Sequence, residues 1–255
     1  MTAILGSQHA LVTGAGSGIG AAIARRLAAS GASLTLVGRR AAPLEALASE
    51  IGSRHGVATA DVSAEASVQQ AFTLAREARG PVTLLVNAAG QAQSAPATRT
   101  SLELWSSQLA VNLTGAFLCC REFILQLPAS TPGRIVNIAS TAGLKGYGYV
   151  SAYCAAKHGL IGYTRALAVE LARRPVTVNA VCPGFTETPL LSQAIDNIMR
   201  TTGRSEAGAR QDLLRTNPQG RFVRPEEVAE AVHWLCLPEA AAVTGTAIPI
   251  AGGEI

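Results

Sequence analysis

Short apolar runs alternate with longer amphipathic stretches along this 255-residue chain, and this alternation restricts the folds that it can adopt. Continuous apolar runs are typical of strands buried on both faces, whereas the longer stretches have the periodicity of helices. The predicted strands cover residues 9–13, 33–37, 56–60, 82–86, 134–139, 176–181 and 247–250. The predicted helices cover residues 20–30, 41–51, 64–79, 102–127 and 151–173, and a further helix begins at Pro225.

Strands that alternate with helices predict an α/β fold with a doubly wound, seven-stranded parallel sheet and helices on both faces, the Rossmann architecture. We find no internal repeat and no Pro-rich linker, so residues 1–255 are predicted to form a single domain. One polar stretch, 186–221, interrupts the alternation after the sixth predicted strand. Because ligands bind at the carboxyl ends of the strands, an insertion there is predicted to be a substrate-binding lid.

Composition and charge argue against several classes of partner. The net charge is +4, but the basic residues are spread along the chain in pairs, so no nucleic-acid partner is predicted. None of the five cysteines forms a CxxC pair or groups with histidines at metal-ligand spacing, which predicts reduced thiols and no metal site. No apolar run approaches about 20 residues, and the first strand begins at His9. The sequence therefore predicts a cytoplasmic protein that does not contact a membrane.

A glycine-rich turn, TGAGSGIG, connects the first predicted strand to the first predicted helix. Phosphate groups bind to backbone N–H groups that a side chain would cover, and the dipole of a helix N-terminus favours the negative charge. Gly14, Gly18 and Gly20 meet this need, with Ser17 and Ile19 between them. The strand–turn–helix context therefore predicts the pyrophosphate site of a dinucleotide.

The end of the second predicted strand indicates which dinucleotide binds. An Asp or Glu at this place would bind the ribose 2′-hydroxyl of NAD(H), but the chain has Arg39 and Arg40 after Gly38. A guanidinium pairs strongly with a phosphate, so Arg39 favours the 2′-phosphate of NADP(H) over NAD(H). Against this preference, Ser17 supplies no second cation inside the glycine turn.

Tyr153 and Lys157 lie four residues apart in a predicted helix, which stacks the two side chains on one face. A phenol has a pKa near 10, and lowering it by about 3 units requires about 4 kcal/mol. An ammonium about 4 Å away supplies roughly this energy at an effective dielectric constant of about 20. We therefore expect Lys157 to lower the pKa of Tyr153 enough for acid–base catalysis.

Other polar residues accompany this pair. Ser140 closes the fifth predicted strand, where its hydroxyl could hold a substrate carbonyl oxygen. Asn112 lies in an apolar helix and is either a satisfied core amide or part of a proton path. The segment 87–90, Asn-Ala-Ala-Gly, closes the fourth strand with small residues that would let the chain run beside a cofactor. The loop 143–150 should border the substrate, which makes Tyr147 and Tyr149 candidates for contact with it.

Together these motifs resemble the short-chain dehydrogenase/reductase family, in its single-domain branch, over essentially the whole chain. The resemblance implies that Tyr153 is the general acid in reduction and the base in oxidation. It also implies that Lys157 lowers the pKa of Tyr153, that Ser140 polarises the carbonyl and that Asn112 holds a water that relays protons. The residues that it implies for cofactor binding are Gly14, Ser17, Gly18, Ile19, Gly20, Arg39, Asp61, Val62, Asn87, Ala88, Gly90, Tyr153, Lys157, Pro183, Gly184, Thr186 and Thr188.

Within the family, residues 133–140 and 179–185 are similar to polyketide ketoreductases and 3-oxoacyl reductases. Residues 215–227 resemble 3-hydroxyacid dehydrogenases, but Ala142 stands where hydroxybutyrate dehydrogenases carry histidine, which argues against a small 3-hydroxy acid. By the same resemblance, helices 102–127 and 151–173 would pair subunits in a homotetramer.

The sequence therefore favours an oxidoreductase that transfers a hydride between NADP(H) and a ketone/secondary alcohol pair, with a 3-oxoacyl thioester or a cyclic ketone as substrate. One alternative is an NAD-dependent secondary-alcohol or 3-hydroxyacyl dehydrogenase. An alternative of another class is a non-catalytic dinucleotide sensor, which would need neither Tyr153 nor Lys157, although both are present.

Overall fold

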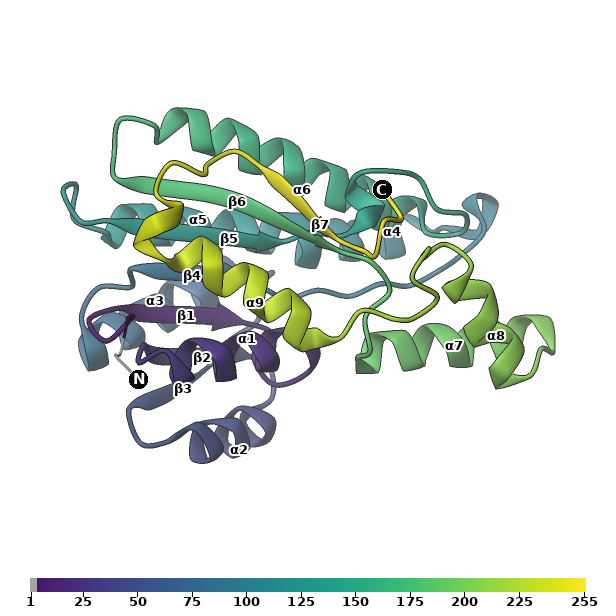
Figure 1. Cartoon of the computed structure of the whole chain (residues 1–255), viewed down its shortest axis with the longest axis horizontal. Helices are drawn as coiled ribbons and strands as arrows, with labels where there is room; N and C mark the ends of the chain where they lie inside the picture. Colours follow the sequence, from purple (N-terminus) through teal and green to yellow (C-terminus); the bar gives the residue numbers. More distant parts are fainter. Residues whose placement is uncertain (1–3) are drawn as a thin grey trace.

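All seven predicted strands form and join one parallel sheet with the order β3-β2-β1-β4-β5-β6-β7 (Figure 1). The computed structural model describes residues 4–255. The strands are β1 His9–Thr13, β2 Ser33–Gly38, β3 His55–Thr59, β4 Leu84–Asn87, β5 Gly133–Ile138, β6 Val176–Pro183 and β7 Ala247–Ile250. The sequence placed these strands to within about two residues. The central strands β1, β5 and β6 are buried over their whole length, whereas the edge strands β3 and β7 are only partly buried.

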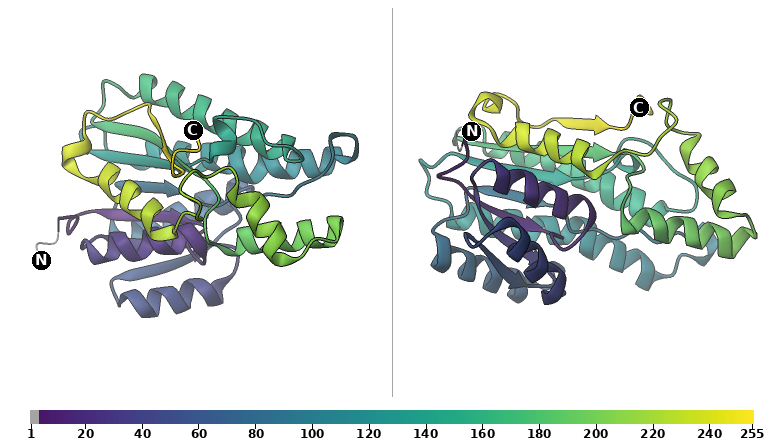
Figure 2. Two further views of the ribbon diagram at one scale, coloured as in Figure 1. Left: turned by 45° about the vertical axis from the view of Figure 1, so that its right-hand side comes forward. Right: turned by 60° about the horizontal axis from the view of Figure 1, so that its bottom comes forward.

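Helices cover both faces of the sheet, as predicted (Figures 1 and 2). The helices are α1 Gly18–Ala29, α2 Ala41–Ile51, α3 Glu65–Arg79, α4 Leu102–Leu109, α5 Gly115–Gln126, α6 Ser151–Glu170, α7 Pro189–Thr202, α8 Glu206–Leu214 and α9 Pro225–Cys236. One apolar cluster lies between the sheet and α1, α2 and α9, and a second lies between the sheet and α3, α5 and α6. The sheet is therefore the middle of three layers.

A single π-helical turn, Ala110–Thr114, separates α4 from α5, where the sequence predicted one regular helix. Asn112 lies in this turn and its Nδ2 donates to the carbonyl oxygen of Gln108 at 3.0 Å. That carbonyl is the acceptor that the backbone N–H of Asn112 would use in a regular α-helix. The side chain thus competes with the backbone ladder, which explains the wider turn at this residue.

The helical segment Leu102–Gln126 is long and apolar enough to cross a membrane, with an 18-residue window of mean hydropathy 1.2. The segment contains no uninterrupted apolar run of about 20 residues, because polar residues such as Gln108 and Asn112 divide it, but its average hydropathy is still high. Half of the window is buried inside the protein. A core helix of a sheet-based fold passes the same test of length and composition.

Two helices, α7 and α8, form within the predicted lid 186–221, which we define here as the lid segment; they extend past the end of the sheet (Figure 2). Leu191, Ile195, Ala209 and Phe222 form a small apolar cluster of their own. Thr186 pairs with Val223 in an isolated bridge, so the segment leaves the sheet and returns to it at one place. The lid segment is therefore an ordered helical hairpin with its own core, and its polar composition reflects its outer surface.

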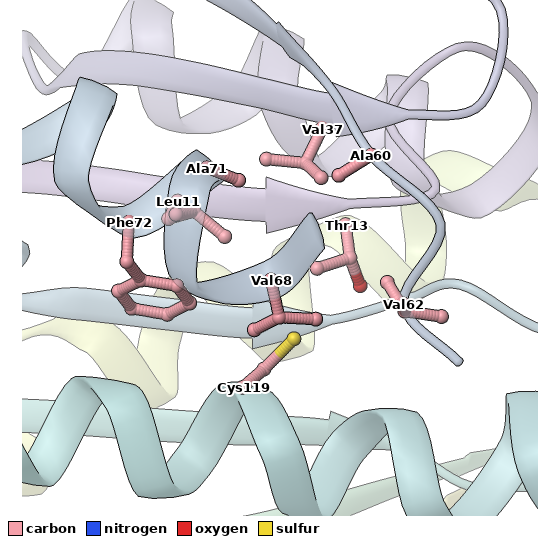
Figure 3. Close-up of a pocket in the computed structure, with 9 residues that line it drawn as sticks. All are labelled: Leu11, Thr13, Val37, Ala60, Val62, Val68, Ala71, Phe72 and Cys119. Atoms are coloured by element: carbon pink, nitrogen blue, oxygen red, sulfur yellow. The ribbon is translucent and has the colours of Figure 1, made fainter. Parts of the chain in front are cut away.

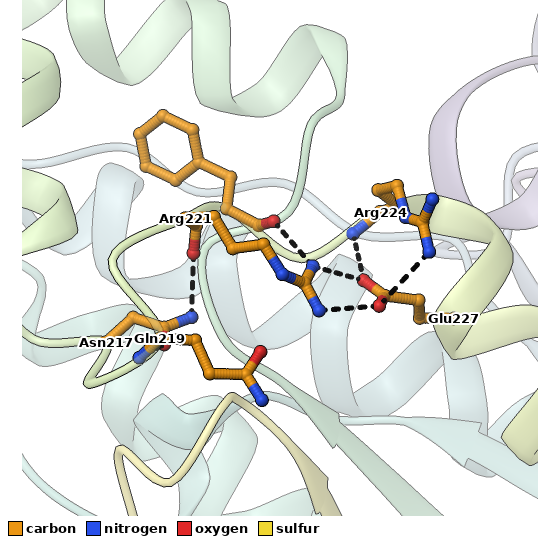
Figure 4. A network of polar contacts seen from close by, with 6 residues as sticks. Asn217, Gln219, Arg221, Arg224 and Glu227 are labelled. Carbon is orange, nitrogen blue, oxygen red and sulfur yellow. Dashed lines mark hydrogen bonds and ion pairs between the residues drawn. The ribbon is translucent and has the colours of Figure 1, made fainter.

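The returning chain is fastened to the N-terminus of α9 (Figure 4). Both terminal nitrogens of Arg221 donate to the carboxylate of Glu227 at 2.7 Å, and the backbone N–H of Arg224 donates to the same group at 2.8 Å. These hydrogen bonds lower the pKa of Glu227 to about 2. Asn217 Nδ2 donates to the carbonyl oxygen of Arg221 at 2.8 Å, which fixes the preceding turn. The base of the lid segment is thereby anchored to the N-terminus of α9.

His9 forms a buried polar contact at the start of β1 that makes stability depend on pH. Its Nδ1 donates to the carbonyl oxygen of Gly80 at 2.9 Å, so its Nε2 accepts from the hydroxyl of Thr35 at 2.9 Å. Burial lowers the pKa of His9 below 6.5, and the folded protein holds it neutral. The unfolded chain takes up a proton as pH falls through about 6.5, so this contribution is present above that pH and is lost below it.

We expect His9→Gln to lower the free energy of unfolding by about 1–3 kcal/mol at pH 7.5, because it leaves the buried hydrogen-bond partners of His9 unsatisfied. The loss should be smaller at pH 5, because the variant lacks the imidazole whose protonation destabilises the folded wild type there. Urea denaturation at both pH values measures the difference. The exposed His158→Gln is the control. An equal loss at both pH values would contradict the assignment.

Candidate active site

The carboxyl ends of β1, β4, β5 and β6 meet at the edge of the sheet from which the lid segment projects (Figure 1). The strand after β1 in the sequence, β2, lies on one side of β1, and β4 lies on its other side. The strand order therefore reverses between β1 and β4, where a ligand crevice is expected. Thr13 connects the two, since its Oγ1 accepts hydrogen bonds from the N–H groups of Ala88 (3.0 Å) and Ala89 (3.1 Å). The predicted site residues come to this edge.

The glycine turn lies against the segment that follows β4. Gly14 has φ +65°, and a Cβ on it would lie 2.8 Å from the carbonyl oxygen of Ala88. A Cβ on Gly20 would lie 2.3 Å from the carbonyl oxygen of Gly14, so neither position accepts a side chain. Ser17 is exposed at the N-cap of α1 and its side chain makes no capping bond. The first turn of α1 has no acidic residue, and its free N–H groups fit a phosphate. The side chain of Ile19 packs against the apolar core, so only the backbone of this residue could contact a phosphate.

Arg39 and Asp61 lie near each other beyond β2 and β3. Arg39 is exposed and forms no ion pair within residues 4–255. Asp61 accepts hydrogen bonds from the hydroxyl (2.6 Å) and the N–H (2.9 Å) of Ser63, and these contacts lower its pKa more than the charge of Arg39 does. Asp61 is therefore ionised and already bound by the chain, whereas the Arg39 guanidinium is free to meet an anion.

Val62 lines a small apolar cavity beneath this region (Figure 3). Leu11, Thr13, Val37 and Phe72 are among the other residues of its wall, and the space is about that of one water molecule. The side chain of Val62 is 7% exposed and a Cβ on Gly115 would lie 2.8 Å from it. Any contact of Val62 with an adenine would therefore use its backbone.

Ser140, Tyr153 and Lys157 converge where β5 meets the start of α6. Lys157 is buried and its Nζ donates to the carbonyl oxygen of Ile138 at 2.8 Å, which holds the ammonium 5.6 Å from the centre of the Tyr153 ring. The Oγ of Ser140 accepts from the N–H of Ala142 at 3.1 Å, so its own O–H remains a donor. The spacing of four residues in α6 does put Tyr153 and Lys157 side by side, as predicted.

The electrostatics of this group differ from the prediction. Burial raises the pKa of Tyr153 to about 12, and the hydroxyl of Ser140 offsets only part of the rise. Burial also lowers the pKa of Lys157 to about 8. The expected lowering of the phenol pKa is therefore wrong for the protein alone, because desolvation disfavours the phenolate and the Ser140 hydrogen bond is too weak to compensate. At neutral pH Tyr153 is a protonated donor.

Asn112 has every polar atom engaged. Its Oδ1 accepts from the N–H of Gln91 at 3.2 Å, and its Nδ2 donates to the carbonyl oxygen of Gln91 at 2.8 Å. A Cβ on Gly90 would lie 3.1 Å from Asn112 Oδ1 and 3.8 Å from Lys157 Nζ, so the missing side chain lets these three groups come together. Asn112 is thus a satisfied amide, and both Asn112 and Lys157 lie close to Gly90. Sequence reasoning missed Gln91, which has no distinguishing pattern.

Asn87 does not point into the crevice. It is buried, and its Nδ2 donates to Asn137 Oδ1 at 2.9 Å and to Cys120 Sγ at 3.3 Å. Asn137 in turn donates to the hydroxyl of Thr164 at 2.9 Å. The amide of Asn87 joins β4 to β5 and α6, so the predicted contact of this residue with a cofactor would use its backbone. The signal for Asn137 was an amide side chain between the apolar residues Val136 and Ile138 of a buried strand. Ala88 and Gly90 follow Asn87 along the crevice edge.

Pro183 ends β6 and begins the opposite wall of the crevice. Thr186 Oγ1 donates to the carbonyl oxygen of Gly184 at 2.9 Å, and Thr188 Oγ1 donates to that of Thr186 at 3.1 Å. A Cβ on Gly18 would lie 3.1 Å from the methyl group of Thr188. The start of the lid segment therefore touches the glycine turn, which closes the crevice at that end. No group of three or more His, Cys, Asp or Glu side chains in the described part of the chain could hold a metal ion.

Comparisons with known proteins agree with this arrangement. A family model described as short chain dehydrogenase matches residues 8–198. The chain is 40% identical to a putative ketoacyl reductase of Streptomyces coelicolor, with 97% of each protein covered. It is also 40% identical to a D-threitol dehydrogenase of Mycolicibacterium smegmatis, over 98% of this chain and 93% of that protein. A crystal structure of an actinorhodin polyketide ketoreductase variant with NADPH superimposes with a TM-score of 0.91 at 38% identity, covering 97% of each chain.

Proposed function

This chain belongs to the short-chain dehydrogenase family, and we propose that within this family it is an NADP(H)-dependent ketoreductase acting on a 3-oxoacyl thioester or a cyclic ketone. As a member it is an NAD(P)-dependent oxidoreductase of ketone and secondary-alcohol pairs. The observation that carries the proposal is the half-buried, protonated phenol of Tyr153 beside the Ser140 hydroxyl and the Lys157 ammonium. The relatives named as ketoacyl reductases support the substrate class.

The residues around the crevice fit a dinucleotide. Gly14 and Gly18 leave backbone open beside the N-terminus of α1 for a pyrophosphate, with the Ser17 hydroxyl next to it. Arg39 would pair with a 2′-phosphate. Residues 183–188 would line the nicotinamide side, and Lys157 would reach the nicotinamide ribose. The bound cofactor supplies the hydride.

The side chains of this protein supply the proton and the orientation. The O–H of Ser140 would donate a hydrogen bond to the ketone oxygen and polarise it. Tyr153 would give its phenolic proton to the same oxygen as negative charge develops there. Lys157 would then stabilise the phenolate until a proton returns, and we assign Asn112 to hold the water that brings it. A phenol that stays protonated at neutral pH is suited to the acid role, which supports the reductive direction.

The second candidate is oxidation of a secondary alcohol with NAD, and the 40% identity to a D-threitol dehydrogenase favours it. A panel of 3-oxoacyl thioesters, cyclic ketones and polyols, monitored at the nicotinamide absorbance with NADPH, NADH and their oxidised forms, distinguishes the two. Reduction of a ketone with NADPH at the highest kcat/KM is expected. Turnover of polyols with NAD alone would refute the ketoreductase proposal.

Arg39→Asp should reverse the cofactor preference, because a charge-assisted Arg–phosphate contact contributes about 1.5–3 kcal/mol. We expect the Kd for NADPH to rise about 10- to 100-fold while the Kd for NADH changes little, as measured by nicotinamide fluorescence. Arg40→Asp makes the same charge change one residue further on and serves as the control. An unchanged NADPH affinity in Arg39→Asp would show that the 2′-phosphate binds elsewhere.

We also propose a homotetramer and a cytoplasmic location. Exposed apolar side chains on the outer surface of α5 and α6, among them Phe117, Leu125 and Val169, support subunit contacts on those helices. The five cysteines are free and buried, which supports a reducing compartment. Light scattering should give about four times the chain mass of 26.2 kDa. The expected partner is otherwise a small ketone or alcohol, with no nucleic acid.

A further inference from the structure

The C-terminal tail, residues 251–255, turns back toward the active site after β7. Gly252 and Gly253 have φ values of +60° and +88°, a backbone conformation that other residues rarely adopt. A Cβ on Gly252 would lie 2.2 Å from Asn217 Oδ1, so the tail is packed against the base of the lid segment. This double turn brings Glu254 into the protein interior, although Glu254 is the penultimate residue.

The carboxylate of Glu254 is almost completely buried, with 1% of its side chain exposed. Its Oε1 lies 3.1 Å from Lys145 Nζ and also accepts a hydrogen bond from the hydroxyl of Tyr147. That hydroxyl lies 2.7 Å from Thr141 Oγ1. Because the single phenolic proton goes to the carboxylate, the Thr141 hydroxyl must donate to the Tyr147 oxygen. The result is a directed chain of hydrogen bonds from Thr141 through Tyr147 to Glu254.

These hydrogen bonds connect three segments that border the proposed active site. Thr141 follows Ser140 directly, and Tyr147 lies in the loop between Ser140 and Tyr153. The Tyr147 ring packs edge-on against Phe185, with ring centres 6.1 Å apart. Glu254 Oε2 is buried without a hydrogen-bond partner and lies 3.1 Å from where a Cβ on Gly184 would be. The tail therefore meets the end of β5, the loop 143–150 and the segment that follows β6.

Stability alone does not account for this carboxylate. Buried ion pairs contribute little net stability, because the cost of desolvation offsets the attraction between the charges, and the unpartnered Oε2 adds a further cost. Burial and the bond to Glu254 both raise the pKa of Tyr147, so the phenol remains a proton donor in this chain. What the arrangement supplies is a fixed position for Tyr147 against Thr141.

We propose that Glu254 is a positioning residue for ketone reduction, which acts through Tyr147 and Thr141 to hold the loop 143–150 beside Ser140. This inference rests on the proposed function. A fixed loop keeps the bound ketone in line with the Ser140 and Tyr153 hydroxyls, whereas a loose loop admits it in unproductive orientations. Substrate recognition should therefore depend on Glu254 more than cofactor binding does.

The test compares Glu254→Ala, Glu254→Gln and Tyr147→Phe with the wild type, with Glu239→Ala as control. Glu239 is an exposed carboxylate near the C-terminus that forms no ion pair within residues 4–255. We expect Glu254→Ala to raise KM for the ketone about 10-fold. The Kd for NADPH should stay within about twofold of the wild-type value. Amide hydrogen exchange should become faster in residues 143–150 only. Glu254→Gln should recover most of the KM, because its amide oxygen still accepts the hydrogen bond from Tyr147. Tyr147→Phe should raise KM similarly, and adding Glu254→Ala to it should have little further effect.

Unchanged KM and unchanged exchange in Glu254→Ala would overturn the proposal. A second result would also overturn it: faster amide hydrogen exchange across the whole protein in Glu254→Ala, together with a KM for Glu254→Gln as high as that for Glu254→Ala. That result would indicate a general structural role for Glu254. If the wild type binds NADPH but reduces no ketone, the proposed function fails instead. Exchange in residues 143–150 then still decides whether Glu254 holds this loop.

Discussion

Tyr153→Phe is expected to lower kcat for ketone reduction by about 10³-fold, because positioned general acids contribute about 10²- to 10⁴-fold. The substitution removes only the hydroxyl, so the ring still packs beside Lys157 and the cofactor site remains intact. The Kd for NADPH should therefore stay within about twofold of the wild-type value. The loss should appear in kcat and in kcat/KM equally, as for an interaction made only in the transition state.

Steady-state kinetics at the nicotinamide absorbance and a fluorescence titration with NADPH measure the two quantities. Tyr149→Phe is the matched control for kcat, because Tyr149 is 71% exposed and lies outside the proton path, and any contact of its hydroxyl with the substrate would affect KM instead. It should leave kcat within about twofold. If Tyr153→Phe retained more than about a tenth of the wild-type kcat, another group would have to be the acid.

Gly14→Ala should raise the Kd for NADPH by about 100-fold or more. The φ of +65° costs any other residue about 1–2 kcal/mol, and the new Cβ would lie 2.8 Å from three backbone atoms of Ala88 and Ala89. Backbone atoms cannot yield as a flexible side chain does, so the turn must move away from the segment after β4. A 100-fold weaker Kd corresponds to about 2.7 kcal/mol, which strain and displaced phosphate contacts together can account for.

Gly16→Ala is the matched control inside the same turn. Gly16 does not have a positive φ, and its Cβ would lie 3.3 Å from a side-chain carbon of Pro43 at the surface of α2. We expect its Kd for NADPH to rise no more than a few-fold. Fluorescence titration measures binding, and urea denaturation separates it from loss of folding. Similar Kd values for Gly14→Ala and wild type would refute the phosphate-binding role of the turn.

Local pattern was sufficient for the sheet and for much of the candidate site. The central strands were predictable because they are buried and rich in apolar residues. The edge strand β7 is only partly buried, yet it matches its prediction at both ends. Gly14 and Gly18 were predictable because their positive φ values belong to the turn itself. Tyr153 and Lys157 share a face because four residues make about one helical turn. Each of these features depends on residues within one short segment.

Features that depend on several segments were not predictable. The Asn87 amide points to Asn137, 50 residues away, and the lid segment folds on Phe222, which lies outside its predicted range. The single helix predicted over 102–127 contains a π-helical turn at Asn112, whose amide also bonds to Gln91.

The sequence by itself determined which groups stand at the edge of the sheet: the glycine turn, Arg39, Ser140, Tyr153 and Lys157. Only the tertiary structure decided the pKa values of these groups and the contacts that hold them in place. The pKa values depend on desolvation, and desolvation depends on every neighbour packed around a group. Burial raised the pKa of Tyr153, whereas the spacing of Tyr153 and Lys157 in the sequence had predicted that it would be lowered. The tertiary structure also brought Glu254 to Tyr147 across 107 residues, a contact that only the folded path of the chain after β7 can create.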